Sequence, residues 1–274
     1  MAIASVRPAA VAGQFYPADD RVLRAQISEM LSSAVALDEA PMPKALVVPH
    51  AGYIYSGPVA ATAYASLGPL RQQIRRVVLL GPAHRMPVSG FALPAAQAFA
   101  TPLGEIPIAR EAWLALQERP DVVVDDRPHA LEHALEVQLP FLQLCLDSFE
   151  LVPLLVGRST PEAAGDLLEA LWGGPETLIV ISSDLSHYHP YHQASTCDRA
   201  TVQQILLMHG GIDHEQACGA TAVNGLIPVA RRHGLEPKLL DLRNSGDTAG
   251  DRSRVVGYAS IAFCDPLPDA ALRH

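Results

Sequence analysis

The sequence predicts a single α/β domain over residues 1–274, with a mostly parallel central sheet flanked by helices. Four apolar runs are nearly continuous, which is typical of strands covered by helices on both faces. Stretches with helical periodicity lie between them, and this alternation indicates parallel strands joined by right-handed crossovers. No repeat, low-complexity tract or long linker interrupts the chain, which favours one domain.

Five segments are the predicted strands, at residues 45–48, 77–80, 151–156, 178–181 and 255–263. The last one, within RVVGYASIAF, alternates between large and small residues more than the others do. We therefore expect it to be an antiparallel return or an edge strand.

Helices are predicted at six places, from periodicity and from capping residues. Asp19 or Asp20 precedes the first, Gly57-Pro58 opens the second, and Thr160-Pro161-Glu162 opens the fourth. The third is long and amphipathic, and Pro140 is expected to kink or end it. The predicted helices cover residues 21–33, 59–67, 129–146, 163–172, 199–208 and 220–232.

Composition excludes several classes of protein. With 49% hydrophobic and 18% charged residues the chain is not disordered, and no apolar run reaches the length of a membrane helix. The start, MAIASVRPAA, lacks the apolar region of a secretory signal, so we expect a cytoplasmic protein. A net charge of −9 argues against nonspecific nucleic-acid binding. Four separated cysteines form neither a disulfide framework nor a zinc knuckle.

Metal-competent side chains follow three of the predicted strands. PHAGY places His50 after the first, GPAH places His84 after the second, and SSDLSH places Asp184 and His187 after the fourth. Ligands of open α/β sheets bind beyond the carboxyl ends of the strands. The sequence therefore predicts one shared pocket at that edge of the sheet.

His50 and His84 are the strongest candidates for metal ligands, because each lies in a loop stiffened by proline and glycine. Two imidazoles and an anionic ligand suit non-haem iron, and a zinc hydrolase site looks similar. Both histidines could instead hydrogen-bond loop carbonyls. Asp184 is a candidate third ligand, orienting group or general base, or else a loop cap, and His187 is considered with it. His189 and His192 are expected to be exposed.

The segment HALEHALE contains a competing motif, H-x-x-E-H, formed by His129, Glu132 and His133 on a predicted helix. This is the order of ligands in the inverzincin metallopeptidases. The match is short, no downstream glutamate ligand is evident, and His129 is expected to be poorly held at the helix start. A second interpretation gives Glu132, His133 and Glu136 the role of lining the pocket or supporting it through hydrogen bonds.

Cys218, in QACGATAV, precedes the last predicted helix. A helix N-terminus lowers the pKa of a thiol and favours the thiolate, which binds metals or attacks electrophiles. The alternative is a small buried residue.

With these residues in hand the chain resembles the MEMO family, protein B of the AmmeMemoRadiSam system. The matching segments include AGQFYPAD, VVPHAGYIYSGPVAATAY, LLGPAH, EHALEVQLPFL, VISSDLSHY and ACGATAV. The resemblance implies a fold similar to class III extradiol (LigB-type) dioxygenases. It also implies a pocket that binds iron or copper, lined by His50, His84 and Cys218. The motifs SSDxxH and EH-x-x-E carry the family's remaining site residues onto Asp184, His187, Glu132 and His133.

Three functions stay open. The first is a metal-dependent redox enzyme of dioxygenase type, although a thiol in place of the dioxygenase carboxylate means that ring opening is not inherited with the fold. The second is a non-enzymatic module that binds a small molecule, a peptide or a partner. The third is a zinc hydrolase. The resemblance further implies a radical-SAM protein and a separate AMMECR1-like protein as partners.

Overall fold

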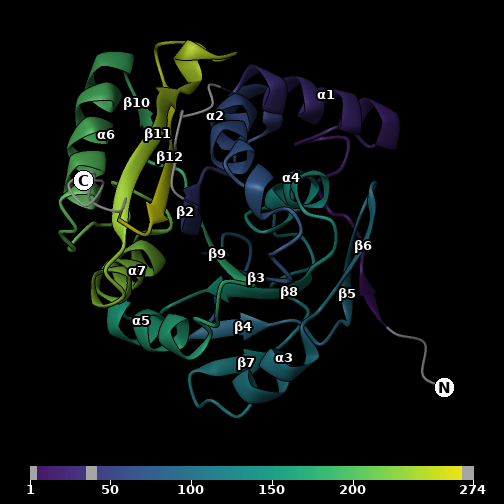
Figure 1. Cartoon of the computed structure of the whole chain (residues 1–274). Coiled ribbons are helices and arrows are strands. Elements are labelled where there is room, and N and C mark those ends of the chain that lie inside the picture. Colours follow the sequence, from purple (N-terminus) through teal and green to yellow (C-terminus); the bar gives the residue numbers. More distant parts are fainter. Residues whose placement is uncertain (1–4, 35–41, 267–274) are drawn as a thin grey trace, which may run out of the picture.

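A nine-stranded mixed sheet forms the centre of the computed structural model, which describes residues 5–34 and 42–266 (Figure 1). The strand order is β10-β12-β2-β9-β3-β8-β4-β7, and β11 pairs with β12 as well. Its longer strands are β2 (Pro43–Val48), β3 (Arg76–Pro82), β8 (Glu150–Val156), β9 (Thr177–Ser182), β11 (Glu236–Asn244) and β12 (Val255–Cys264). The short ones are β4 (Phe91–Leu93), β7 (Val122–Val124) and β10 (His187–His189). A second sheet contains β1 (Val6–Arg7), β5 (Ala98–Thr101) and β6 (Gly104–Pro107).

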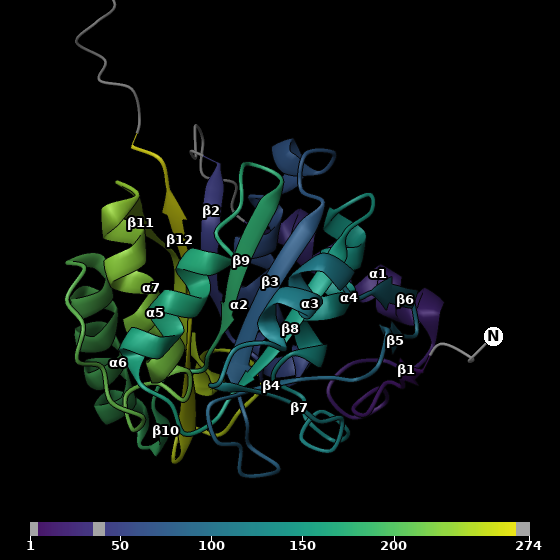
Figure 2. The same cartoon turned by 90° about the horizontal axis from the view of Figure 1, so that it is seen from below.

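The four central strands β2, β9, β3 and β8 are parallel to one another and run side by side between two layers of helices (Figure 2). Successive residues of each strand enter different cores. In β9, Leu178 and Val180 pack into one core, whereas Ile179 and Ile181 pack into the other. Because both faces are buried, the strands need apolar residues at every position. The predicted α/β class with a mostly parallel sheet is therefore confirmed.

The outer strands account for the antiparallel pairs. β12 is antiparallel to β2, as expected, but it is not an edge strand, because β11 pairs along its other side, and β10 pairs with its first two residues. β4 is antiparallel to β8. In the part of the chain that the structure describes, seven short or polar strands were not predicted, since segments such as EPKLLDLRN of β11 carry no continuous apolar run.

The helices form two layers, one over each core. α1 (Asp20–Ser33), α2 (Tyr53–Ala65) and α4 (Leu139–Cys145) cover the first core. The second lies under α3 (Arg110–Leu116), α5 (Pro161–Ala170), α6 (Tyr191–Leu206) and α7 (Ala220–Arg232). Within the described ranges, none of these helices has the length and apolarity that a membrane crossing requires.

Helix starts follow the capping residues in some cases and tertiary contacts in others. Asp19 caps α1 by accepting hydrogen bonds from two backbone N–H groups, and Thr160 caps α5. α7 has the predicted bounds. The start predicted for α2 is wrong, because the helix begins at Tyr53, whose N–H donates to Phe15 O, and Pro58 lies inside it. α6 also begins earlier than predicted.

The long helix predicted over residues 129–146 is the largest error. Turns occupy residues 127–131, and the 3₁₀ helix η2 (Glu136–Gln138) leads into α4. Pro140 lies in the first turn of α4, where a proline is favoured, so it helps to start the helix instead of kinking it.

A buried ion pair replaces the expected helical hydrogen bonds in this segment. The Glu136 carboxylate, which is fully buried, accepts hydrogen bonds from the Arg7 guanidinium and from the backbone N–H groups of residues 10 and 11. Arg7 also donates to the backbone carbonyls of His129 and Glu132, at 2.9 and 2.7 Å. The N-terminal segment thus holds the non-helical segment in place.

We predict that Glu136→Gln destabilises the protein by about 3–5 kcal/mol, because it leaves the buried Arg7 charge without a counter-ion. Urea unfolding measures the change. Glu29→Gln, at an exposed glutamate of α1, serves as the control and should stay within about 0.5 kcal/mol of the wild type. Equal stability of both variants would show that the pair is unimportant.

Candidate metal centre

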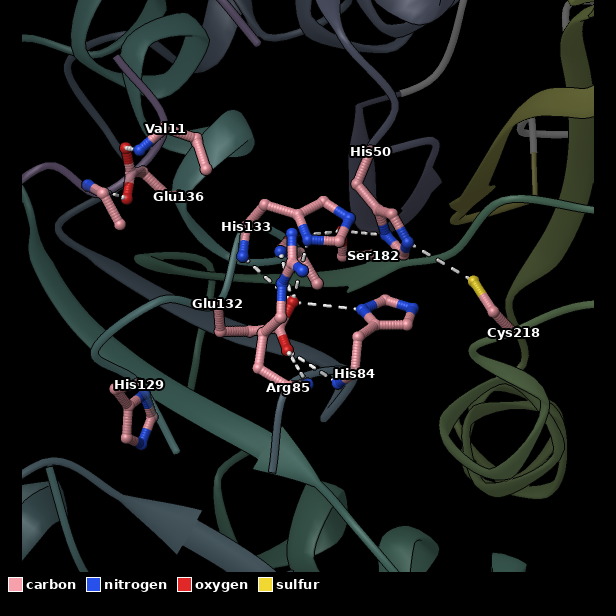
Figure 3. A network of polar contacts seen from close by, with 12 residues as sticks. Val11, His50, His84, Arg85, His129, Glu132, His133, Glu136, Ser182 and Cys218 are labelled. Atoms are coloured by element: carbon pink, nitrogen blue, oxygen red, sulfur yellow. Dashed lines mark hydrogen bonds and ion pairs between the residues drawn. The ribbon is translucent and has the colours of Figure 1, made fainter. Parts of the chain in front are cut away.

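Three histidines meet at the carboxyl edge of the parallel strands (Figure 3). His50 follows β2, His84 follows β3, and His133 lies in the turns before η2. Each offers one ring nitrogen to a cluster in which these atoms lie within 4.8 Å of one another. His50 and His84 thus lie together at the ends of their strands, as expected, and His133 lies with them. The cluster can hold a metal ion.

The His50 ring is fixed in one tautomer by a buried serine. His50 Nδ1 lies 2.9 Å from Ser182 Oγ. The single Ser182 proton is directed to Ala134 O at 2.6 Å, and Ser182 Oγ accepts from Gln138 Nε2 at 2.8 Å. Since the hydroxyl has only one proton, Nδ1 must be the donor to Oγ. His50 Nε2 is then unprotonated and available as a ligand.

The orientation of Gln138 is itself determined by its neighbours. Its Nε2 donates to Pro49 O at 2.9 Å, and its Oε1 accepts from Tyr64 Oη at 2.7 Å. The chain of hydrogen bonds thus runs from α2 to His50. Burial lowers the pKa of His50 to about 4, so its ring is neutral at physiological pH.

A buried carboxylate, Glu132, plays the corresponding part for the other two histidines. Glu132 Oε1 lies 3.0 Å from His84 Nδ1 and 3.1 Å from His133 Nδ1. Burial raises the pKa of Glu132, but the close approach of the His133 and His84 imidazoles outweighs it and holds the pKa well below its usual range. An ionised carboxylate favours a proton on each Nδ1, which leaves each Nε2 as the ligand atom.

Asp184 and Cys218 flank His50. The Asp184 carboxylate accepts the backbone N–H of His50 at 2.7 Å, so it fixes the loop, and among the described residues no hydrogen bond joins it to the His50 ring. The Asp184 backbone N–H donates to Cys218 Sγ at 3.2 Å, and Sγ lies 3.3 Å from His50 Nε2. Burial, with Asp184 nearby, raises the pKa of Cys218 to about 12. Burial therefore outweighs the lowering of this pKa that the helix N-terminus was expected to cause.

The other histidines after β9 lie apart from the cluster. His187 pairs with Val256 in the sheet, and its ring packs at the edge of Tyr188. Among the described residues it has no hydrogen bond to the cluster. His192 is exposed as expected, whereas His189 is half-buried.

His129 is a structural residue. Contrary to expectation it is well held, being 1% exposed, and its Nε2 donates to Ala92 O at 3.1 Å. It does not belong to the three-histidine cluster, and no helix joins it to His133. The prediction of an H-x-x-E-H helix is therefore wrong.

A groove of about 380 Å³ opens beside the cluster. Its walls come from the loops after β3 and β8 and from the loop before α7, and they include His84, Val88, Gly157, Arg158, His214 and Cys218. Sequence reasoning missed Ser182, Gln138 and Arg158. The first could have been found, because a serine in the last position of a buried strand needs a hydrogen-bond partner.

Comparisons with known proteins identify the family of the chain. The family model described as Memo-like protein matches residues 7–262. The chain belongs to the MEMO1 family. A MEMO1 family protein of Sulfolobus acidocaldarius is 36% identical, over 95% of this chain and all of the relative. One from Methanopyrus kandleri is 37% identical, over 94% of this chain and 98% of the relative.

The fold also has a solved counterpart outside these relatives. A crystal structure of an uncharacterized protein from Escherichia coli K12 aligns with a TM-score of 0.50 and 17% identity. The alignment covers 80% of the MEMO1 family chain and 98% of the other. At this identity the similarity concerns the fold alone.

We predict that Ser182→Ala releases the His50 tautomer. Without the hydroxyl, Nδ1–H loses its acceptor, and a proton on Nε2 could instead be donated to Cys218 Sγ. Nitrogen-15 NMR of the metal-free protein at pH 7 should show one His50 tautomer in the wild type and a mixture in the variant. Ser32→Ala, on the exposed face of α1, is the control. An unchanged tautomer in Ser182→Ala would contradict the assignment.

A second prediction concerns pH. Burial lowers the pKa of His129 to about 4, whereas an unfolded histidine titrates near about 6.5. Between these values the unfolded chain binds a proton that the folded chain does not, so stability falls as pH falls from 6.5 to 4.

His129→Gln keeps an N–H donor for Ala92 O but cannot titrate. Its unfolding free energy should therefore depend less steeply on pH in this window, by up to about 1.4 kcal/mol per pH unit. Urea unfolding at several pH values measures the slope, with His192→Gln as the control. A slope equal to that of the wild type would count against the lowered pKa.

Proposed function

We propose that His50, His84 and His133 bind a first-row transition-metal ion, iron(II) in the first place, and that the chain is a metal-dependent oxidoreductase. One observation carries the proposal. Three imidazoles converge, with Nδ1 of His50 hydrogen-bonded to Ser182, Nδ1 of His84 to Glu132, and Nδ1 of His133 lying 3.1 Å from Glu132 Oε1, so that three Nε2 lone pairs are left for one ion. Such a preset arrangement avoids the cost of ordering ligands on binding.

The donor set fits the metals expected from the family resemblance. Neutral imidazole suits iron, copper and zinc. Iron oxygenases often add a carboxylate, but Glu132 and Asp184 are occupied by N–H groups here. The third ligand is therefore an imidazole. We propose Cys218 as a fourth ligand, because its Sγ lies 3.3 Å from His50 Nε2 and a metal ion would displace the thiol proton.

When bound, such an ion supplies one-electron redox chemistry. The protein's own residues hold the ion and admit the substrate. Glu132 and Ser182 keep the imidazoles in the required tautomers, and Asp184 keeps the His50 loop in place. The groove lined by His84 and Cys218 gives a small molecule or a peptide end access to the open side of the cluster.

A second candidate, a zinc hydrolase, is favoured by the same three imidazoles, since catalytic zinc sites use three protein ligands and an open position. It would act at this cluster and not through His129. A non-enzymatic module that binds a radical-SAM protein or an AMMECR1-like protein is the remaining alternative.

Metal content tests the proposal. We predict that tag-free protein purified anaerobically holds close to one iron per chain, measured by elemental mass spectrometry. The variants His50→Ala and His133→Ala should each lose at least nine-tenths of the bound iron, because only two of the three imidazole ligands remain. Cys218→Ser should keep iron but release it more readily to a chelator. His192→Ala is the control with an exposed histidine.

Retention of iron by His133→Ala would contradict the ligand set. One zinc per chain, with the same dependence on the three histidines, would transfer the proposal to hydrolysis. The absence of any metal after reconstitution would overturn both enzymatic proposals and leave the partner-binding role.

A further inference from the structure

The groove beside the cluster differs in charge from the rest of the molecule. The chain has 29 acidic and 20 basic residues and a net charge of −9. Nevertheless, no aspartate or glutamate is among the residues that line the groove, and one arginine, Arg158, is. Any metal ion at the cluster adds positive charge. The groove is thus a cationic site in an acidic protein, and such a site attracts anions.

Arg158 has no partner of its own. Among the described residues, no hydrogen bond or ion pair of its guanidinium is found, whereas other arginines are paired, such as Arg119 with Asp121 and Arg232 with Glu169. The side chain is exposed. It is therefore free to bind a ligand.

The backbone of Arg158 is nonetheless held firmly. Its N–H donates to Val88 O at 2.8 Å, and its carbonyl accepts from Gly90 N at 2.9 Å. The loop after β8 and the loop after β3 approach so closely that a Cβ on Gly157 would lie 2.2 Å from Val88 O. A larger residue than glycine would separate them. The arginine is thus presented from a constrained loop, as a binding group requires.

The same groove reaches the cluster at its other wall. His84 and Cys218 line it, and both adjoin His50: the His50 and His84 ring centroids are 5.2 Å apart, and Cys218 Sγ is 3.3 Å from His50 Nε2 (Figure 3). A molecule in the groove can therefore contact Arg158 and the open side of the cluster together. A volume of about 380 Å³ suits a small molecule.

We infer that the substrate of this site is a small molecule with an oxyanion group, a carboxylate or a phosphate, which Arg158 binds while the remainder of the molecule faces the histidine cluster. Guanidinium groups bind both oxyanions through two parallel hydrogen bonds. The inference rests on the proposed function for its second anchor, the metal ion. The contact with Arg158 is measurable with or without that ion.

Three probes with one aromatic ring each distinguish the chemical classes of ligand: benzoate carries a carboxylate, phenyl phosphate carries a phosphate, and benzamide is neutral. Each is titrated into metal-free and iron-loaded protein, and the NMR signal of the Arg158 Nε–H group, identified by its loss in Arg158→Gln, reports the contact. We expect benzoate or phenyl phosphate to shift this signal and benzamide to leave it in place. Which of the two binds more tightly distinguishes a carboxylate from a phosphate substrate.

Variants test the role of the guanidinium. Arg158→Gln should weaken binding of the preferred anion at least tenfold and leave the metal content of the protein unchanged. Arg158→Lys keeps the charge but not the planar guanidinium, so its affinity for the anion should lie between those of the wild type and Arg158→Gln. Arg24→Gln, at an exposed arginine of α1 outside the groove, is the control.

The possible failures are distinct. Protein that binds iron but prefers neither anion to benzamide, or binds them equally in Arg158→Gln, overturns the inference and leaves the proposed function standing. If the protein takes up no metal even after reconstitution but still binds an anion through Arg158, the inference stands and the oxidoreductase proposal falls.

Discussion

The candidate site depends on a buried negative charge, that of Glu132. This carboxylate is 2% exposed and accepts hydrogen bonds from four backbone N–H groups, those of His84, Arg85, His133 and Ala134, as well as from an imidazole. Such a charge is tolerated in a protein interior only when it is fully hydrogen-bonded. The requirement fixes two loops at once, the one after β3 and the one before η2. It thereby places His84 and His133 beside each other.

The same constraint explains the local structure around residue 132. An α-helix there would direct the backbone N–H groups of His133 and Ala134 to carbonyls within the segment. Instead these groups point to Glu132 Oε1, at 2.9 and 3.0 Å. Without a helix, the backbone carbonyls of His129 and Glu132 accept hydrogen bonds from Arg7 instead, and Arg7 is paired with Glu136. The polar interactions of the site therefore outweigh a strong helical pattern in the sequence.

Much of the fold follows from local sequence, but the site follows only in part. The central strands were predictable because continuous apolar runs indicate burial on both faces of a sheet. His50 and His84 were predictable as site residues because they follow the carboxyl ends of such strands. His133 as a cluster member was not predictable from periodicity, since its position depends on Glu132 and on the distant Arg7. The pKa of Cys218 was misjudged because burial beside Asp184 exceeds the effect of the helix terminus.

The central claim is that three imidazole Nε2 atoms converge on one ion. Anomalous diffraction at the iron absorption edge, from crystals of anaerobically loaded protein, tests it most directly. We predict a single peak within bonding distance of Nε2 of His50, His84 and His133. A peak at His129 or His187, or coordination through Glu132 in place of His133, would contradict it.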